Sequence, residues 1–300
     1  MYYKHSGRFT LGGLIVAMVT GCGGSLILAS VYAHGIILIP EARLAVLATI
    51  AFGALIGVAS GYGLVWGRVR NDSVGLAVTG TISPLALYLS WAMWVPAILD
   101  SQHVRHIDWT TLAQRPGALW DLVCMINRYG TWGLSSGEAT KGLALWAIWF
   151  LEAALVIGMA LFAGIGVLNH RPFCEACGRW CKRGANLILA PPQDVAQLKL
   201  QLEATDFRPL ENLGPGNKCT DHLLVALDSC EQCREFHTMS LTHVTIRRSK
   251  MGKPTVSNKM IVQHLLVGPG QADVVRLLSE KMARATNATP KVNAAAAGKR

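Results

Sequence analysis

The sequence is poor in charged residues. They make up only 15% of the chain, whereas 51% of the residues are hydrophobic. Soluble domains carry roughly 25% charged residues, because their surfaces must be solvated. The apolar residues are also grouped in blocks instead of being spread along the chain. This composition argues against an ordinary soluble protein and predicts one that contacts lipid.

The sequence also lacks the common motifs of catalysis and nucleotide binding. It has no glycine-rich phosphate-binding loop, no nucleophile elbow and no histidine pair at the spacing used by zinc proteases. We therefore expect no enzymatic activity.

Four long apolar segments dominate the first part of the chain. They span residues 11–31, 44–66, 74–99 and 143–168. Each has at least the roughly 20 residues that a helix needs to cross the hydrocarbon core of a bilayer. The sequence therefore predicts an α-helical membrane domain of four transmembrane helices over residues 1–169, with an outer loop at 100–141. In that loop, Pro116 and Gly130 mark the two ends of an expected amphipathic helix.

The distribution of basic residues indicates how these helices are oriented. Residues 1–169 hold 9 basic and 7 acidic residues, whereas residues 170–300 hold 19 and 11. Basic residues that flank the segments on one side are Lys4, Arg8, Arg68, Arg70, Arg171, Lys182 and Arg183. The positive-inside rule places that side in the cytoplasm, so both termini are expected there. The basic tail could contact anionic headgroups of the lipid bilayer or nucleic acid.

Two features within the apolar segments have specific implications. Gly53, Gly57 and Gly61 recur every four residues, which predicts a helix face that packs closely on a neighbouring backbone. Glu152 is the only charged residue within the four segments and is expected near the bilayer midplane. It could line a proton or cation path. Alternatively, it could be protonated and bonded to Ser83, Tyr88 or Ser90.

The residues after the fourth apolar segment predict a mixed soluble domain. Short apolar runs predict strands, and two amphipathic segments predict helices. The expected strands are at 186–189, 222–227, 237–246 and 256–267, and the expected helices at 192–204 and 271–285. We expect a small cytosolic α+β domain at 170–285 and a disordered basic tail at 286–300.

Two Cys-x-x-Cys motifs lie within this domain. Cys174 and Cys177 form the first, and Cys230 and Cys233 the second. Two such turns typically hold a structural Zn²⁺ through four thiolates, and the reduced cytoplasm favours metal over disulfides. We therefore predict a zinc-ribbon-like site, although 52 residues separate the two motifs instead of roughly 15 to 20. Residues that could replace one of the four ligands are Cys181, Cys219, His222 and His237.

A redox role for the first motif would need a thioredoxin-like setting at a helix N-terminus, which the sequence does not indicate.

Several motifs resemble those of uncharacterised bacterial multipass membrane proteins that carry a cysteine-bearing cytosolic tail. These motifs are Tyr32–Pro40, Gly53 with Gly57, residues 68–71, Leu119-Trp120, Ile126-Asn127, residues 130–132 and the Phe-Cys-x-x-Cys-x-x-Trp-Cys run at 173–181. The resemblance implies a location in the bacterial inner membrane. It implies no activity, substrate or catalytic residue.

The sequence favours a membrane-tethered interaction or regulatory protein whose zinc-held tail binds an unknown protein partner. One alternative is a small transporter or channel component that uses Glu152. Another is a nucleic-acid-binding tail. The sequence leaves open whether the chain forms an oligomer.

Overall fold

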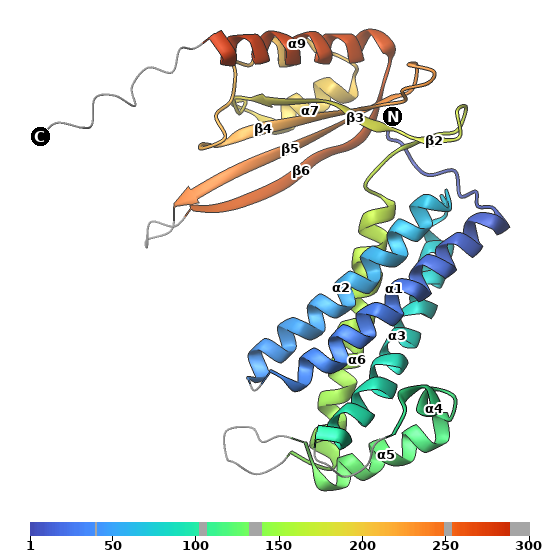
Figure 1. Cartoon of the computed structure of the whole chain (residues 1–300). Helices are drawn as coiled ribbons and strands as arrows, with labels where there is room; N and C mark the ends of the chain where they lie inside the picture. The colour runs from blue at the N-terminus through green and yellow to red at the C-terminus, as the bar shows by residue number, and fades with distance from the viewer. Residues whose placement is uncertain (40, 102–106, 132–139, 249–253, 289–300) are drawn as a thin grey trace, which may run out of the picture. The chain divides into compact units, whose positions relative to one another are not determined.

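The chain folds into two compact units. The computed structural model describes residues 1–39, 41–101, 107–131, 140–248 and 254–288. One unit comprises His5–His170, and the other comprises Met1–Lys4 together with Arg171–Arg300. The first unit is helical, and the second is built around a β-sheet (Figure 1).

Four long helices form the helical unit. They are α1 (Leu11–Ile37), α2 (Ala42–Trp66), α3 (Asp72–Ser101) and α6 (Leu143–Leu168). Each is long and apolar enough to cross a membrane, and the four helices correspond to the four apolar segments of the sequence. The first helix continues to Ile37, six residues beyond its predicted end. Helices α1 and α6 each pack against both α2 and α3, so the four form a bundle.

The glycine stripe of α2 lies against α6. A Cβ atom built on Gly57 would lie 2.2 Å from the carbonyl oxygen of Ala160, and one on Gly53 would lie 2.6 Å from that of Val156. A Cβ on Gly61 would lie 2.7 Å from Cβ of Val167. Such distances leave no room for a side chain, so the two helix backbones approach closely along this line.

Two shorter helices follow α3. They are α4 (Trp109–Ala113), which the sequence did not predict, and α5 (Pro116–Tyr129), which begins and ends where Pro116 and Gly130 indicated. The buried side chains of α5 are Leu119, Val123, Ile126 and Asn127. Its apolar residues pack in one cluster with Ala92 and Val95 of α3 and with Leu145 of α6, so other parts of the protein cover its apolar face.

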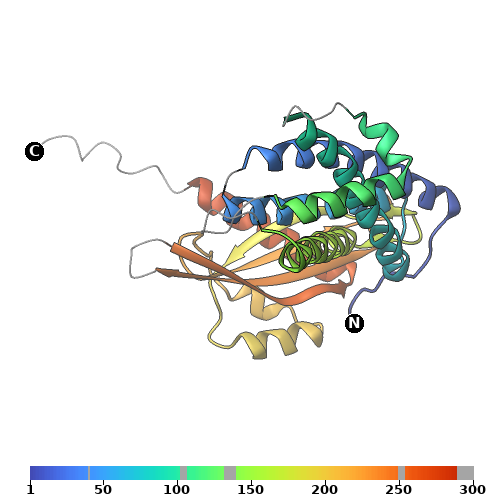
Figure 2. The ribbon, with the colours of Figure 1, turned by 90° about the horizontal axis from the view of Figure 1, so that it is seen from below.

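The second unit contains a four-stranded antiparallel sheet in the order β3-β4-β5-β6. Its strands are β3 (Lys182–Leu189), β4 (His222–Ser229), β5 (His237–Arg248) and β6 (Pro254–Val267). A separate two-stranded ribbon consists of β1 (Phe173–Cys174) and β2 (Arg179–Trp180). The helices are α7 (Val195–Glu203), α8 (Arg208–Glu211) and α9 (Pro269–Ala288). Figures 1 and 2 show β5 and β6 as a long ribbon that extends past the other two strands.

One face of the sheet carries the core of this unit. Leu223, Val225 and Leu227 alternate along β4 and are fully buried. They belong to one apolar cluster with Leu202 of α7 and Val275 of α9, so both helices cover the same face. The four expected strands and both expected helices are present, although the first strand begins at Lys182 instead of residue 186.

The last helix includes the first three residues of the tail that the sequence predicted to be disordered at 286–300. Helix α9 continues to Ala288, three residues past its expected end. Alanine has the highest helix propensity and recurs in this stretch, at positions 283, 285 and 288, which favours continuation of the helix. Residues 289–300 lie outside the described part of the chain.

The N-terminal residues extend the edge of the sheet. The amide of Tyr3 donates to the carbonyl of His264 at 2.9 Å, and that of Leu266 donates to the carbonyl of Met1 at 2.9 Å. Tyr2 pairs antiparallel with Leu265 of β6. Residues 1–4, which the sequence assigned to the membrane domain, therefore pack with the sheet.

Candidate metal centre

The first Cys-x-x-Cys motif forms a tight turn between β1 and β2. Cys174 ends β1 and pairs with Arg179 across the ribbon, so the chain reverses over the residues between them. Gly178, which directly follows Cys177, has φ of +62°. Glycine adopts this left-handed conformation without steric penalty, and it closes the turn here.

The second motif forms a turn of the same kind between β4 and β5. Ser229 pairs with His237, so residues 230–236 form the connection of a hairpin. The amide of Cys230 donates to the carbonyl of Phe236 at 3.0 Å, and that of Arg234 donates to the carbonyl of Cys230 at 3.2 Å. Arg234 follows the second cysteine and has φ of +56°, as Gly178 does in the first turn. The two turns therefore share one backbone design.

The sheet explains why 52 residues can separate the two motifs. The first motif precedes β3, with only the short strand β2 between them, and the second directly follows β4. These strands are antiparallel, and Lys182 at the start of β3 pairs with Ser229 at the end of β4. The intervening helices α7 and α8 leave from the opposite end of this strand pair. Strand pairing therefore returns the chain to its starting point and places the two turns side by side.

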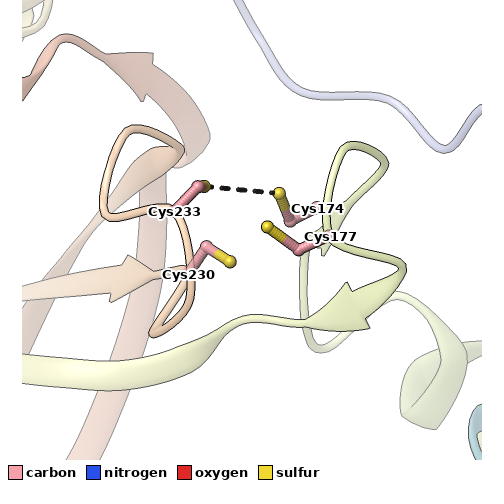
Figure 3. Close-up of side chains that lie close together, drawn as sticks. All are labelled: Cys174, Cys177, Cys230 and Cys233. Carbon is pink, nitrogen blue, oxygen red and sulfur yellow. Dashed lines mark hydrogen bonds between the residues drawn. The ribbon is translucent and has the colours of Figure 1, made fainter.

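The four sulfur atoms converge on one point. The Sγ atoms of Cys174, Cys177, Cys230 and Cys233 all lie within 4.8 Å of one another. Figure 3 shows the two pairs facing each other from opposite loops, and the Sγ atoms of Cys174 and Cys233 are 3.8 Å apart. Four sulfurs placed 2.3 Å from a tetrahedral ion would lie about 3.8 Å apart. All four cysteines are free thiols, so the cluster has the size and chemistry of a metal site.

The surroundings of the cluster affect its sulfurs differently. The backbone amides of Glu235 and Phe236 donate to the sulfur of Cys233 and lower its pKa to about 6. Burial raises the pKa of the Cys174 thiol, because a thiolate is poorly solvated there. A divalent cation would reverse this effect, since metal ligation deprotonates a thiol outright.

The four candidate substitute ligands lie outside the group of converging sulfurs. Cys181 is buried beside them, and burial raises its pKa to about 12, which is the behaviour of a small apolar side chain. Cys219 is exposed. Nδ1 of His222 is 2.7 Å from the carbonyl oxygen of Thr220. In His237, Nδ1 is 2.8 Å from Oγ of Ser229 and Nε2 is 2.8 Å from the carbonyl oxygen of Arg234, so both ring nitrogens are engaged.

Glu152 lies in the helical unit and lines a cavity near one end of the bundle. Among the described residues, no hydrogen bond joins it to the expected partners Ser83, Tyr88 or Ser90. The hydroxyl of Tyr88 donates to the carbonyl of Ala113, and that of Ser90 donates to the carbonyl of Leu87.

The shared turn design predicts different responses to substitution at its two left-handed positions, Gly178 and Arg234. Gly178→Ala should lower the free energy of unfolding by about 1 kcal/mol, because a Cβ atom disfavours this conformation. The alanine Cβ would meet no atom within 4 Å, so the effect would be purely conformational. Arg234→Gly should be nearly neutral, since the relieved strain offsets the added entropy of the unfolded chain. Denaturant unfolding of the metal-loaded protein would measure both, and equal effects would contradict the shared design.

No protein-family model, curated protein or solved structure matches the chain.

Proposed function

We propose that this chain is a membrane-tethered interaction or regulatory protein of the bacterial inner membrane. In this proposal α1, α2, α3 and α6 span the bilayer, and a structural Zn²⁺ holds the cytoplasmic sheet unit together. The observation that carries the proposal is the convergence of four thiols from two separate turns.

The chemistry of the donor set favours zinc in a structural role. Thiolates are soft ligands, and four of them around a tetrahedral site suit Zn²⁺ or iron. Four protein ligands leave no position for water or substrate, as is typical of structural and not catalytic zinc. A reduced cytoplasm keeps the thiols available.

The pairing of the N-terminal residues with β6 supports the proposed topology. Met1–Lys4 precede α1, whereas β6 follows α6, and the two pair within one compact unit. Segments that pair directly must lie on the same side of a membrane. The chain must therefore cross it an even number of times, which agrees with four spans. The excess of basic residues after α6 favours the cytoplasmic side.

The β5–β6 ribbon offers a surface for a partner. On β6, residues 255–260 are exposed, including Val256 at 57% and Met260 at 54%. Arg247 and Lys259 add positive charge to the same region. An exposed strand edge with apolar and basic side chains is suited to binding an extended or acidic segment of another protein.

Site-specific photocrosslinking in cells would test this proposal. A photoreactive residue at Met260 should give a discrete adduct with another protein, whereas one at Leu200, which is 66% exposed on α7, should not. Absence of an adduct at Met260, or equal labelling at Leu200, would count against the ribbon as the binding surface.

A further inference from the structure

The helical unit contains a cavity of about 350 Å³, and none of the four clustered cysteines lines it. Residues from all four long helices line it, and Tyr32 comes from α1, Trp91 and Trp94 from α3, and Trp149 and Glu152 from α6. Such a volume matches sites that bind small molecules. The lining combines several large aromatic rings with the partly buried acidic group of Glu152 and the exposed one of Glu41.

The tryptophans that line the cavity contact one another edge to face. The Trp91 and Trp149 rings lie 4.8 Å apart at an interplanar angle of 89°, and the Trp91 and Trp94 rings lie 5.3 Å apart at 74°. Edge-to-face contacts of this kind hold indoles in fixed orientations. Fixed indole rings around a cavity are suited to binding a cation through their negative faces.

The hydroxyl groups of Tyr32 and Ser90, which line the cavity, are already committed to other partners, whereas the lining hydroxyl of Thr131 has no partner among the described residues. The hydroxyl of Thr49 donates to the carbonyl of Ala45 at 3.0 Å, so it accepts the hydrogen of Tyr32, whose oxygen lies 2.9 Å away. The hydroxyl of Ser90 donates to the carbonyl of Leu87 at 2.7 Å. Among the described residues, no side chain donates to Glu152. Its carboxylate therefore has no counter-charge supplied by this part of the protein.

The bundle closes directly beyond the cavity. Val156 lines the cavity one helical turn after Glu152, and its carbonyl oxygen would lie 2.6 Å from a Cβ on Gly53. Ala160 and Gly57 meet in the same way one turn further along. This close contact between α2 and α6 prevents the cavity from continuing along that interface. A cavity closed at one end is typical of a binding site, whereas a transport path would have to continue.

We propose that this cavity binds a monovalent organic cation, specifically an alkylammonium or quaternary ammonium compound. The carboxylate of Glu152 supplies the counter-charge, and the indoles of Trp91, Trp94 and Trp149 surround the alkyl groups. Metal cations fit poorly, because Mg²⁺ and Ca²⁺ need six or more oxygen ligands and indoles offer none. The carboxylate of Glu152 lies among apolar side chains and therefore needs an opposite charge nearby. An alkylammonium ion supplies that charge, and its alkyl groups supply apolar surface to contact the indoles.

Calorimetric titration of the purified full-length protein with tetraethylammonium would test the proposal. We expect saturable binding that weakens about tenfold or more in the Glu152→Gln variant, which keeps the shape of the side chain but removes its charge. The matched control is Glu41→Gln, since Glu41 also lines the cavity but is exposed, and this change should have a much smaller effect. Trp91→Phe should retain more binding than Trp91→Leu, because phenylalanine keeps an aromatic face.

The neutral carbon isostere of tetraethylammonium provides a test that needs no variant. It has the same shape without the charge, so it should not compete with tetraethylammonium for the wild-type protein. Competition by the isostere, absence of saturable tetraethylammonium binding, or unchanged binding in Glu152→Gln would overturn the proposal. None of these outcomes depends on the metal centre, so the proposal stands or fails separately from the proposed function.

Discussion

Replacing Cys230 with serine is expected to abolish metal binding and to unfold the two turns that hold the four thiols. A serine hydroxyl is a poor ligand for Zn²⁺, and three thiolates cannot close the tetrahedral site. Structural zinc contributes about 10 to 16 kcal/mol in isolated finger peptides, which is as large as the whole stability of many domains. The loss should therefore be the largest of any single substitution in the sheet unit.

The effect should be concentrated around the metal and not spread evenly over the unit. The main core beneath α7 and α9 is a separate cluster from the one formed by Cys174, Cys181 and Cys230. Amide hydrogen exchange should therefore increase most in residues 173–181 and 230–236, and much less in the buried residues of β4. Elemental analysis of the purified full-length protein should fall from about one zinc per chain to none.

Cys219→Ser is the matched control for this experiment. Cys219 belongs to the same unit but is exposed and lies outside the group of converging sulfurs. Its replacement should leave the metal content and the exchange pattern unchanged. Retention of zinc by Cys230→Ser, or its loss from Cys219→Ser, would contradict the assignment of ligands. Iron in place of zinc would support the four-thiol site but change the metal.

The sequence was sufficient to identify the four cysteines but not the route that joins them. A Cys-x-x-Cys spacing is local and can be recognised directly, since it follows from the geometry of one turn. The convergence of the two motifs depends on the register of β3 against β4, in which Lys182 lies opposite Ser229. Register depends on the packing of the whole sheet, and a short apolar run does not define it.

Two other features were missed for related reasons. Met1–Lys4 is too short to show any periodicity, so its pairing with β6 left no signal in the sequence. Tryptophans near the ends of apolar segments, as in α3 and α6, are typical anchors at the membrane interface, and this property belongs to each residue alone. Their grouping around Glu152 depends on how each helix is rotated about its axis, which apolar segments without a polar face do not specify.

The glycines of α2 show what a helical pattern can and cannot define. The four-residue spacing of Gly53, Gly57 and Gly61 predicted a close helix contact, but not that the partner would be α6. Gly63 contacts α1 instead, since a Cβ atom there would lie 3.0 Å from the carbonyl oxygen of Ala17. One helix thus contacts two neighbours through different glycines, and sequence spacing alone does not distinguish them.

Gly57→Ala is expected to strongly destabilise the helical unit at the contact between α2 and α6. Its Cβ would lie 2.2 Å from the carbonyl oxygen of Ala160, and a backbone atom cannot move aside as a flexible side chain can. The helices must separate to admit it, which we expect to lower the free energy of unfolding by about 3 kcal/mol. The separation should also disturb the cavity beside Val156.

Gly158→Ala in α6 is the control for this substitution, because a Cβ there would meet no atom within 4 Å. It should be neutral or stabilising by up to about 1 kcal/mol, since alanine favours the helix over glycine. Unfolding of the full-length protein in mixed micelles, followed by tryptophan fluorescence, would compare the two variants. Equal midpoints would mean that α2 and α6 do not touch at Gly57, and the bundle would then need another arrangement of its helices.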